Sequence, residues 1–256
     1  MDIDLSLAIA CYKDAPHLKK NVIFIRDLLA KTSWKVEYIF VEDAGNDGSR
    51  EIIDELVKKE MEFEKTVFHE KNTGRGQSIQ DAFEIAEGNV LGYIDIDLAV
   101  SPVYIPLMLH KLFNCNYDVA NALRIYRTSF AFSSVTRDIF SYCYRLISRK
   151  LLKMPFYDTE TGYKFFRREA YKKLAEYAKD PGWFWDTELM VYSHLLGLKV
   201  IEIPCLYQRD KNKATTVNII LDTIEYLRKL FRLRKKNKKA LMNYFLITIA
   251  PVLRSM

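Results

Sequence analysis

Hydrophobic and polar positions follow two periods along the first half of the chain. Apolar runs of the length of buried strands predict β-strands at Leu5–Ile9, Val36–Val41, Thr66–Phe68, Val90–Ile94 and Val119–Ala122. Apolar residues at helical spacing predict helices that begin near Pro16, Ser49, Ile79 and Ser101. Strands that alternate with helices indicate βαβ units. We therefore expect an α/β fold with a mostly parallel central sheet flanked by helices.

The second half of the chain has a less regular pattern. It predicts helices at Phe130–Leu152, Phe184–Leu196 and Thr216–Arg234, and short strands at Tyr163–Phe166 and Lys199–Ile203. A last apolar stretch, 240–253, is shorter than the roughly 20 residues that span a bilayer. We expect an α/β domain over 1–210 and an amphipathic helical tail over 211–256.

Composition excludes several classes of protein. The chain has 256 residues, of which 49% are hydrophobic and 28% charged, so it is neither disordered nor collagen-like. The four cysteines lie far apart and form no Cys-x-x-Cys pair, which favours a reducing compartment over a disulfide scaffold. The acidic N-terminal segment, with its short alternating apolar stretch, predicts a strand rather than an export signal.

Positive charge is concentrated in the tail. Residues 211–256 hold 11 of the 39 Lys and Arg residues but only 2 of the 33 acids. Eight of these basic residues lie between Arg228 and Lys239, between an amphipathic helix and an apolar end. A basic segment combined with apolar residues is typical of attachment to an anionic membrane surface, which we expect for 216–256. The alternative is an ordinary helix packed on the domain with a solvated basic face.

Acidic residues follow three of the predicted strands. Asp14 follows the first, Asp43 the second, and Asp95 and Asp97 the fourth. Because ligands of open α/β sheets bind beyond the carboxyl ends of the strands, these acids share a candidate site. Carboxylates without nitrogen or sulfur ligands favour Mg²⁺ or Mn²⁺, ions that commonly bridge substrate phosphates. The alternative is a set of solvated loop acids.

Motifs of several other enzyme classes are absent from the sequence. It has no Gly-x-x-x-x-Gly-Lys-Ser/Thr, no Gly-x-Gly-x-x-Gly after the first strand and no Gly-x-Ser-x-Gly. A P-loop NTPase, a dinucleotide-dependent oxidoreductase and a serine hydrolase are therefore disfavoured. The four histidines show no metal-ligand spacing.

Together these segments resemble family 2 glycosyltransferases of the GT-A fold over nearly the full length. The matching segments of the first half are Ala10–Asp14, Val41–Ser49, Asn72–Gly76 and the Asp-x-Asp of Asp95–Asp97. In the second half, Asp158–Phe166 and Phe184–Leu189 resemble segments of dolichyl-phosphate glucosyltransferases. The departures are Ala10 for Pro, Lys13 for Asn, and no Gly-Ser-Lys after Arg209.

The resemblance implies roles for individual residues. Those implied to bind the nucleotide sugar are Ala10, Tyr12, Asp14, Asp43, Asn72, Arg75 and Asp95. It implies that Asp95 and Asp97 hold Mg²⁺ or Mn²⁺, with Asp97 as the direct ligand and a catalytic residue through that ion. Candidates for contacting phosphate groups of the acceptor are Arg124, Arg209 and Lys211.

Asp186 is the second candidate catalytic residue. If the acceptor is a hydroxyl, Asp186 would be the general base; an acceptor phosphate is already ionised and needs none. The structural alternative is that Asp186 caps the helix it opens.

We expect an inverting glycosyltransferase that uses a UDP- or GDP-linked sugar and a polyprenyl phosphate, at the cytoplasmic face of the membrane. One alternative is a family 2 enzyme that acts on a hydroxyl of a surface glycan or lipid-linked oligosaccharide. Another is a nucleic-acid-binding protein that uses the basic tail, which no recognisable motif supports, so we expect no nucleic-acid partner.

Overall fold

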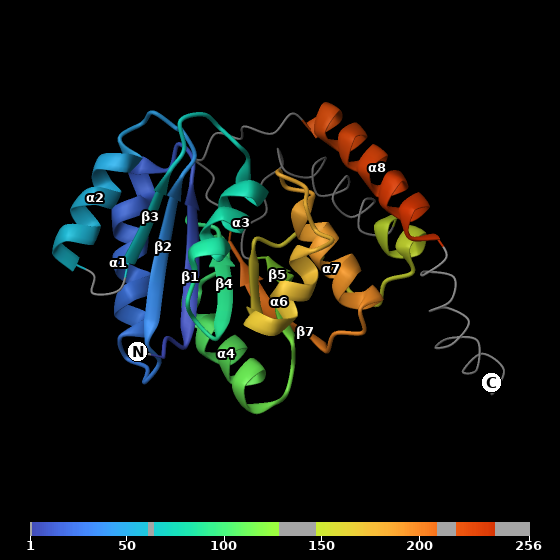
Figure 1. Ribbon diagram of the computed structural model, residues 1–256, viewed down its shortest axis with the longest axis horizontal. Helices are drawn as coiled ribbons and strands as arrows, with labels where there is room; N and C mark the ends of the chain where they lie inside the picture. Colours follow the sequence, from blue (N-terminus) through green and yellow to red (C-terminus); the bar gives the residue numbers. More distant parts are fainter. Residues whose placement is uncertain (1, 61–63, 128–146, 209–218, 239–256) are drawn as a thin grey trace.

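The strands form one sheet with helices on both faces (Figure 1). The computed structural model describes residues 2–60, 64–127, 147–208 and 219–238. The described strands are β1 Leu5–Cys11, β2 Val36–Glu42, β3 Glu64–Phe68, β4 Val90–Ile94, β5 Val119–Arg127, β6 Tyr163–Arg167 and β7 Val200–Tyr207. Their order is β3-β2-β1-β4-β6-β5-β7. The sequence predicts every one of these strands, although β3 begins earlier and β5 and β7 end later than expected.

One strand interrupts the parallel arrangement. β1 pairs in parallel with β2 and β4, β2 with β3, and β5 with β7. β6 is antiparallel to both of its neighbours, β4 and β5. It therefore begins at the edge of the sheet where β1, β2 and β4 end. This reversal brings the residues before β6 to the candidate site.

The helices divide between the two faces of the sheet. Their bounds are α1 Ala15–Leu29, α2 Ser49–Glu60, α3 Arg75–Ile85, α4 Ile105–Asn114, α6 Arg168–Ala175, α7 Trp185–Leu195 and α8 Ile219–Lys236. A 3-10 turn, Pro102–Tyr104, precedes α4, and residues 147–152 are also helical. The predicted helix 130–152 lies mostly outside the described residues, and α6 was not predicted.

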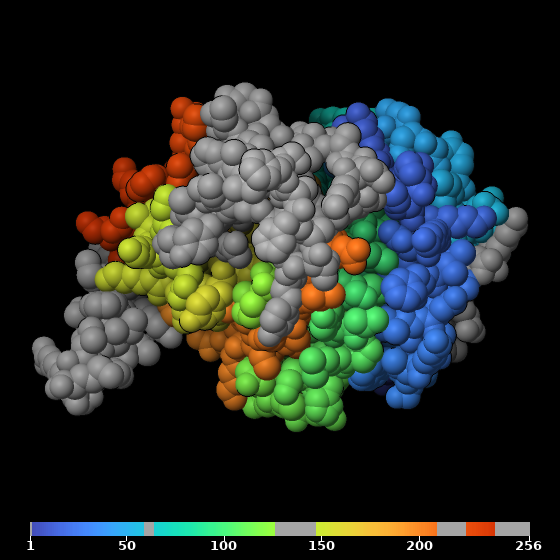
Figure 2. All heavy atoms as spheres, turned by 180° about the vertical axis from the view of Figure 1, so that it is seen from behind, coloured from blue at the N-terminus to red at the C-terminus, as the bar shows by residue number. Residues whose placement is uncertain are grey.

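Alternation along the central strand explains the two layers. Leu5, Leu7 and Ile9 of β1 are buried in one hydrophobic cluster with apolar residues of α1, α2 and α4. Ala8 of the same strand is buried in a second cluster, with residues of α3, α6, α7 and α8. In Figure 2, which shows the molecule from behind, α1 in blue and α4 in green cover the first face. Because side chains of a strand alternate between faces, β1 contributes to both layers.

Helix α8 packs on the second layer through a narrow apolar face. Leu230 and Leu233 are buried against it, whereas Ile224 and Phe231 are exposed. The helix predicted at Thr216–Arg234 is confirmed in its described part, from Ile219 onward. None of the helices in the described ranges is long and apolar enough to cross a membrane.

Candidate functional site

The carboxyl ends of β1, β2 and β4 bring the predicted acids to one edge of the sheet. Parallel pairing sets Cys11 of β1 beside Glu42 of β2, and the Asp43 N–H donates to the Cys11 carbonyl at 2.9 Å. β4 ends at Ile94, so that Asp95 follows at the same edge. Helix α3 begins there with Arg75. The predicted convergence of strand ends is confirmed.

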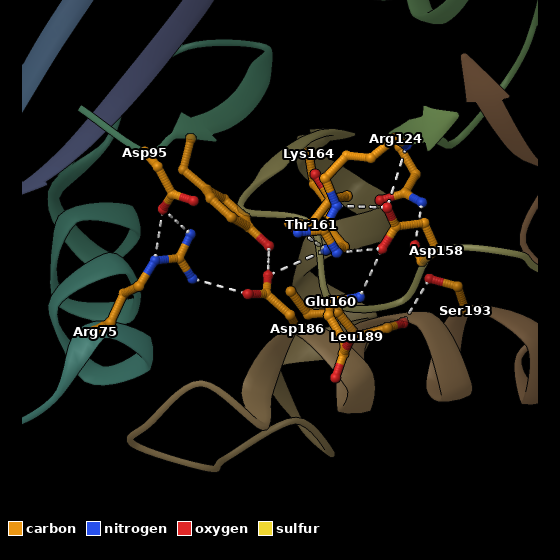
Figure 3. Close-up of polar contacts among 12 residues, drawn as sticks. Arg75, Asp95, Arg124, Asp158, Glu160, Thr161, Lys164, Asp186, Leu189 and Ser193 are labelled. Atoms are coloured by element: carbon orange, nitrogen blue, oxygen red, sulfur yellow. Dashed lines mark hydrogen bonds and ion pairs between the residues drawn. The ribbon is translucent and has the colours of Figure 1, made fainter. Parts of the chain in front are cut away.

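Arg75 is the central cation of this edge (Figure 3). Its Nε and Nη2 lie 2.8 and 2.7 Å from Asp95 Oδ1, and its Nη1 donates to Asp186 Oδ2 at 2.8 Å. Burial alone would lower the pKa of Arg75, but the two carboxylates more than compensate and raise it, so the guanidinium stays charged. Arg75 thus joins the end of β4 to α7.

Asp186 is buried inside a polar network rather than facing an open cleft. Its side chain is 1% exposed and accepts hydrogen bonds from the Tyr93 hydroxyl and, at 3.1 Å, from the Lys164 ammonium (Figure 3). The helix-cap interpretation of Asp186 is wrong. Phe184 occupies the N-cap position of α7, and the Asp186 carboxylate is turned toward the sheet instead.

Lys164 is the buried partner of Asp186 on β6. Its side chain is fully buried and also donates to the Thr161 carbonyl. Burial lowers the pKa of Lys164, while Asp186 and Asp158 oppose that shift. Tyr93 and Lys164 donate to Asp186 Oδ1 and Arg75 donates to Oδ2, so both oxygens of Asp186 accept hydrogen bonds.

Gly162 fits closely against the Asp95 carboxylate. A Cβ atom at Gly162 would overlap Asp95 Oδ2 and Arg75 Nη2. The Asp95 N–H also donates to the Gly162 carbonyl at 3.0 Å. The residue before β6 is therefore packed against the Arg75–Asp95 pair, and a side chain at that position would displace the pair.

The Asp43 carboxylate organises the loop before α3. Oδ1 accepts from the Thr73 N–H at 2.7 Å and its hydroxyl at 2.9 Å, and lies 2.8 Å from His69 Nδ1. Oδ2 accepts from the Gly74 N–H at 3.0 Å. Asp43 is 3% exposed. This arrangement fixes the strand end relative to the first residue of α3.

The other residues predicted to bind the nucleotide sugar lie around Asp43. Tyr12 is exposed, and its N–H donates to Asp14 Oδ2 at 3.0 Å. Ala10 is half-buried near the end of β1. Asn72 is exposed and donates to the Asp43 carbonyl at 3.3 Å. The structure therefore places all of these residues around the ends of β1 and β2.

The two metal candidates differ in their surroundings. Asp95 is paired with Arg75, whereas Asp97 is half-buried and accepts from the Ala99 N–H at 3.1 Å. The described residues contain no group of three or more His, Cys, Asp or Glu that could hold a metal. This donor set does not form an all-protein cage. It fits Mg²⁺ or Mn²⁺ held by one or two carboxylates together with ligand phosphates.

Arg124 is held by a buried carboxylate. Its Nε and Nη2 donate to the two oxygens of Asp158 at 2.6 and 2.7 Å (Figure 3). Burial alone would raise the pKa of Asp158, but Arg124 outweighs it and the pKa falls below the ordinary value of 3.8. Arg124 and Asp95 line one small cavity of about 20 Å³. The other two phosphate candidates, Arg209 and Lys211, lie outside the described residues.

Sequence reasoning missed several residues of this network. Lys164 and Gly162 lie within the segment 158–166, but no pattern in the sequence indicates a role for either, and Tyr93 lies in a strand predicted to be buried. Asp186, the partner of Lys164 and Tyr93, lies on a different element, α7. A charged residue in an otherwise apolar strand was the signal that could have singled out Lys164.

The chain matches one family model over most of the α/β region. The model, described as Glycosyl transferase family 2, matches residues 6–175. Glycosyltransferase AglD of Haloferax volcanii is 28% identical over 224 residues, which cover 87% of this chain and 35% of that protein. Undecaprenyl-phosphate 4-deoxy-4-formamido-L-arabinose transferase of Aeromonas hydrophila is 28% identical over 124 residues, 48% of this chain and 38% of that protein. The chain thus spans little more than a third of the length of either relative.

Solved structures share the fold. Glucosyl-3-phosphoglycerate synthase from Mycobacterium tuberculosis in complex with UDP has a TM-score of 0.68 at 15% identity, over 90% of this chain and 79% of that one. A structure of the same enzyme with Mn²⁺, UDP and glucosyl-3-phosphoglycerate has a TM-score of 0.65 at 14% identity, over 90% of this chain and 77% of that one. These similarities confirm the predicted GT-A architecture.

Proposed function

This chain belongs to glycosyl transferase family 2, and from that membership we propose that it transfers a sugar, with inversion, from a UDP- or GDP-linked donor to a polyprenyl phosphate. The name of one relative, an undecaprenyl-phosphate transferase, supports the acceptor class. The UDP complexes of the structural neighbour support a nucleotide donor. The contacts of Asp186 are the observation that favours a phosphate over a hydroxyl as the acceptor.

The donor would bind along the ends of β1, β2 and β4. We assign the nucleoside to the edge formed by the exposed residues Tyr12 and Asn72, the half-buried Ala10 and the buried Asp14, with Asp43 beneath them. Both carboxylate oxygens of Asp43 already accept hydrogen bonds from the 69–74 loop. Its main contribution is therefore to hold this loop in the shape that receives the nucleobase. Asp95 and Arg75 would then lie beside the diphosphate and sugar.

The acids after β4 suit a divalent ion. We propose that Asp97 is the direct ligand of Mg²⁺ or Mn²⁺, because Arg75 already contacts Asp95 Oδ1 through two nitrogens. When bound, such an ion supplies positive charge that stabilises the leaving diphosphate. Asp95, held by Arg75 and Gly162, would keep the loop that carries Asp97 in place.

The environment of Asp186 favours a phosphate acceptor. A general base must be able to reach and accept the acceptor proton. Asp186 is buried, and its two oxygens accept from Arg75, Tyr93 and Lys164. Removing a proton from a hydroxyl would require breaking this network. A phosphate acceptor is already ionised at neutral pH and needs no base, so we propose that Asp186 positions Arg75 instead.

The acceptor phosphate would bind on the side of Arg124. The Arg124 side chain is 23% exposed and borders the same cavity as Asp95. Because Asp158 fixes its orientation through two hydrogen bonds, the guanidinium is preorganised for a second anion on its free edge. Arg209 and Lys211, which follow β7, are proposed on sequence grounds to add charge there.

A membrane-bound acceptor requires contact with the bilayer surface. The outer side of α8 carries exposed apolar and basic residues, among them Ile224, Arg228, Phe231 and Arg232. We propose that α8 and the rest of 216–256 attach the enzyme peripherally to the cytoplasmic face. The basic tail is assigned to anionic lipid, and no nucleic-acid partner is proposed.

Calorimetry with nucleoside diphosphates tests the donor class directly. The protein in Mn²⁺ buffer should bind UDP or GDP, and Asp43→Ala should weaken that affinity. The variant Asp54→Ala, at an exposed acid on α2, is the matched control and should bind as the wild type does. No binding of either nucleotide, in either Mn²⁺ or Mg²⁺, would refute the proposed function.

A further inference from the structure

Residues 180–184 form a loop that connects the candidate donor site to helix α8. We propose that α8 positions Arg75 through this loop, with Lys229 and Asp180 as the positioning residues. This inference rests on the proposed function for its catalytic meaning. Its structural basis is a series of contacts from α8 to the first turn of α3.

The loop lies directly against the first turn of α3. The Gln77 N–H donates to the Pro181 carbonyl at 2.9 Å. A Cβ atom at Gly74 would come within 2.6 Å of that same carbonyl oxygen, and one at Gly76 within 2.6 Å of the carbonyls of Asp180 and Gly182. The glycines before and after Arg75 therefore allow this close approach. A displacement of the loop would move the turn that carries Arg75.

The loop also contacts the Arg75 side chain itself. The Arg75 guanidinium lies 4.8 Å from the centre of the Trp183 ring, and 5.3 Å from that of Tyr93. Trp183 is half exposed, although it is a large apolar residue. Contact between a guanidinium and an aromatic face is attractive and fixes the plane of the cation. Trp183 thereby helps to orient the cation that holds Asp95 and Asp186.

On its other side the loop is fastened to α8. Lys229 Nζ lies 2.8 Å from Asp180 Oδ2, while Asp180 Oδ1 accepts from the Gly182 N–H at 2.9 Å. The Phe184 and Tyr226 rings meet edge to face, 5.4 Å apart. Burial alone would lower the pKa of Lys229, but Asp180 and Glu225 outweigh it and raise the pKa, so the ion pair persists at neutral pH.

Helix α7 also holds the loop 180–184 through hydrogen bonds at its start. Glu188 Oε2 accepts from the N–H groups of Lys179 and Asp180, both at 2.8 Å. The same helix carries Asp186, the second carboxylate of Arg75. α8 lies beside α7 (Figure 1), with Asn237 donating to the Tyr192 hydroxyl at 3.4 Å. The loop is thus held between α3, α7 and α8.

The consequence is that the helix proposed to attach the enzyme to the membrane also supports its donor site. Small displacements of a binding residue reduce catalysis strongly, because the reacting groups must stay aligned. Loss of the Lys229–Asp180 contact should therefore weaken donor binding and turnover, even though Lys229 itself is remote from the donor.

The test compares three substitutions on α8. Lys229→Met removes the ion pair, Lys229→Arg retains it, and Arg228→Met removes an equal charge from an exposed neighbour. Amide hydrogen exchange of the segment 74–80 measures, without any ligand, whether α8 stabilises the first turn of α3. Calorimetry with UDP or GDP and Mn²⁺ reads its effect on the donor site.

Lys229→Met should speed exchange at Gln77 and weaken nucleotide affinity about fivefold, the equivalent of a 1 kcal/mol ion pair. Lys229→Arg and Arg228→Met should match the wild type in both measurements. Unchanged exchange in Lys229→Met, or equal changes in Arg228→Met, would overturn the inference. Failure of the wild type to bind nucleotide would instead refute the proposed function, and the exchange data would still decide whether α8 positions the loop.

Discussion

Gly162 is packed against the carboxylate of Asp95, with no space for a side chain between them. The contact arises because β6 runs antiparallel to β4, so the start of one strand meets the end of the other. The Asp95 N–H donates to the Gly162 carbonyl, which fixes the backbone on both sides. The first acid of the Asp-x-Asp segment is thereby held by backbone packing as well as by Arg75.

Replacing Gly162 with alanine should displace the Arg75–Asp95 pair. The added methyl group has no free volume, and overpacking of this kind typically costs about 1–3 kcal/mol of folding free energy. We expect Gly162→Ala to remain folded but to lose most nucleotide affinity. Urea unfolding and calorimetry on the same preparation measure the two effects. Wild-type affinity in this variant would contradict the assigned site.

Arg75→Lys should fail to replace the arginine despite equal charge. The guanidinium contacts Asp95 through Nε and Nη2 and Asp186 through Nη1, a fork that one ammonium group cannot reproduce. We expect turnover to fall by about 10²-fold, as for misplaced catalytic groups in general. Arg26→Lys, at a partly buried arginine of α1 that pairs with Asp27, is the control and should keep wild-type turnover. Turnover in Arg75→Lys within twofold of the wild type would refute the bridging role.

Sugar transfer should depend on a divalent metal ion, and that dependence should require Asp97. EDTA should abolish sugar transfer, and Mn²⁺ or Mg²⁺ should restore it. Asp97→Asn should lose the metal-dependent part of nucleotide binding with little change in unfolding free energy, because the residue is half-buried in a loop. The exposed acid Asp54 supplies the control, Asp54→Asn. Full activity of Asp97→Asn in EDTA would exclude the proposed metal site.

The Arg124–Asp158 pair should make stability depend on pH. The pKa of Asp158 is below its ordinary value of 3.8 in the folded chain, so the unfolded chain binds the proton more readily. The stabilisation is therefore complete above that value and is lost as pH falls through the folded pKa. Asp158→Asn should lower the free energy of unfolding by about 2 kcal/mol at neutral pH. This is less than the loss of a fully buried ion pair would cause, because Arg124 is partly exposed.

Urea unfolding of both proteins at several pH values measures this difference. The difference in unfolding free energy between the wild type and Asp158→Asn should become smaller below pH 4. Glu169→Gln, which breaks a surface pair with Lys172, should leave the unfolding curve nearly unchanged at every pH. A gap that stays constant down to pH 2 would show that the pair does not lower the pKa of Asp158.

Local patterns were sufficient for most of the fold. Strands and helices in the first half have clear periods, and the carboxyl ends of parallel strands must meet at one edge, so Asp43, Asp95 and Asp97 were placed correctly. The direction of β6 was not predictable, because a short apolar run does not reveal which strands it joins. Helix α6 was missed because Ala170, Tyr171 and Leu174 form only a short apolar face among charged residues.

Long-range polar contacts limited what the sequence could reveal of the site. Asp186 was singled out, but its partners Tyr93 and Lys164 lie on two other elements, and no local pattern links them. The resemblance and its place at the end of the predicted strand Val119–Ala122 single out Arg124, yet nothing near it in sequence indicates that Asp158 holds it. These pairings depend on sheet order, which only the folded chain fixes.

The most direct test of the proposed transfer uses two acceptors that differ in one group. A prenyl phosphate and the corresponding prenol are offered with the nucleotide sugar that the protein binds, and the glycosylated product is measured by mass spectrometry. Because Asp186 is already engaged by Arg75, Tyr93 and Lys164, we propose that it does not serve as the base for a hydroxyl. We predict product from the phosphate alone. Comparable product from the prenol, or from a glycan hydroxyl with no product from the phosphate, would contradict it.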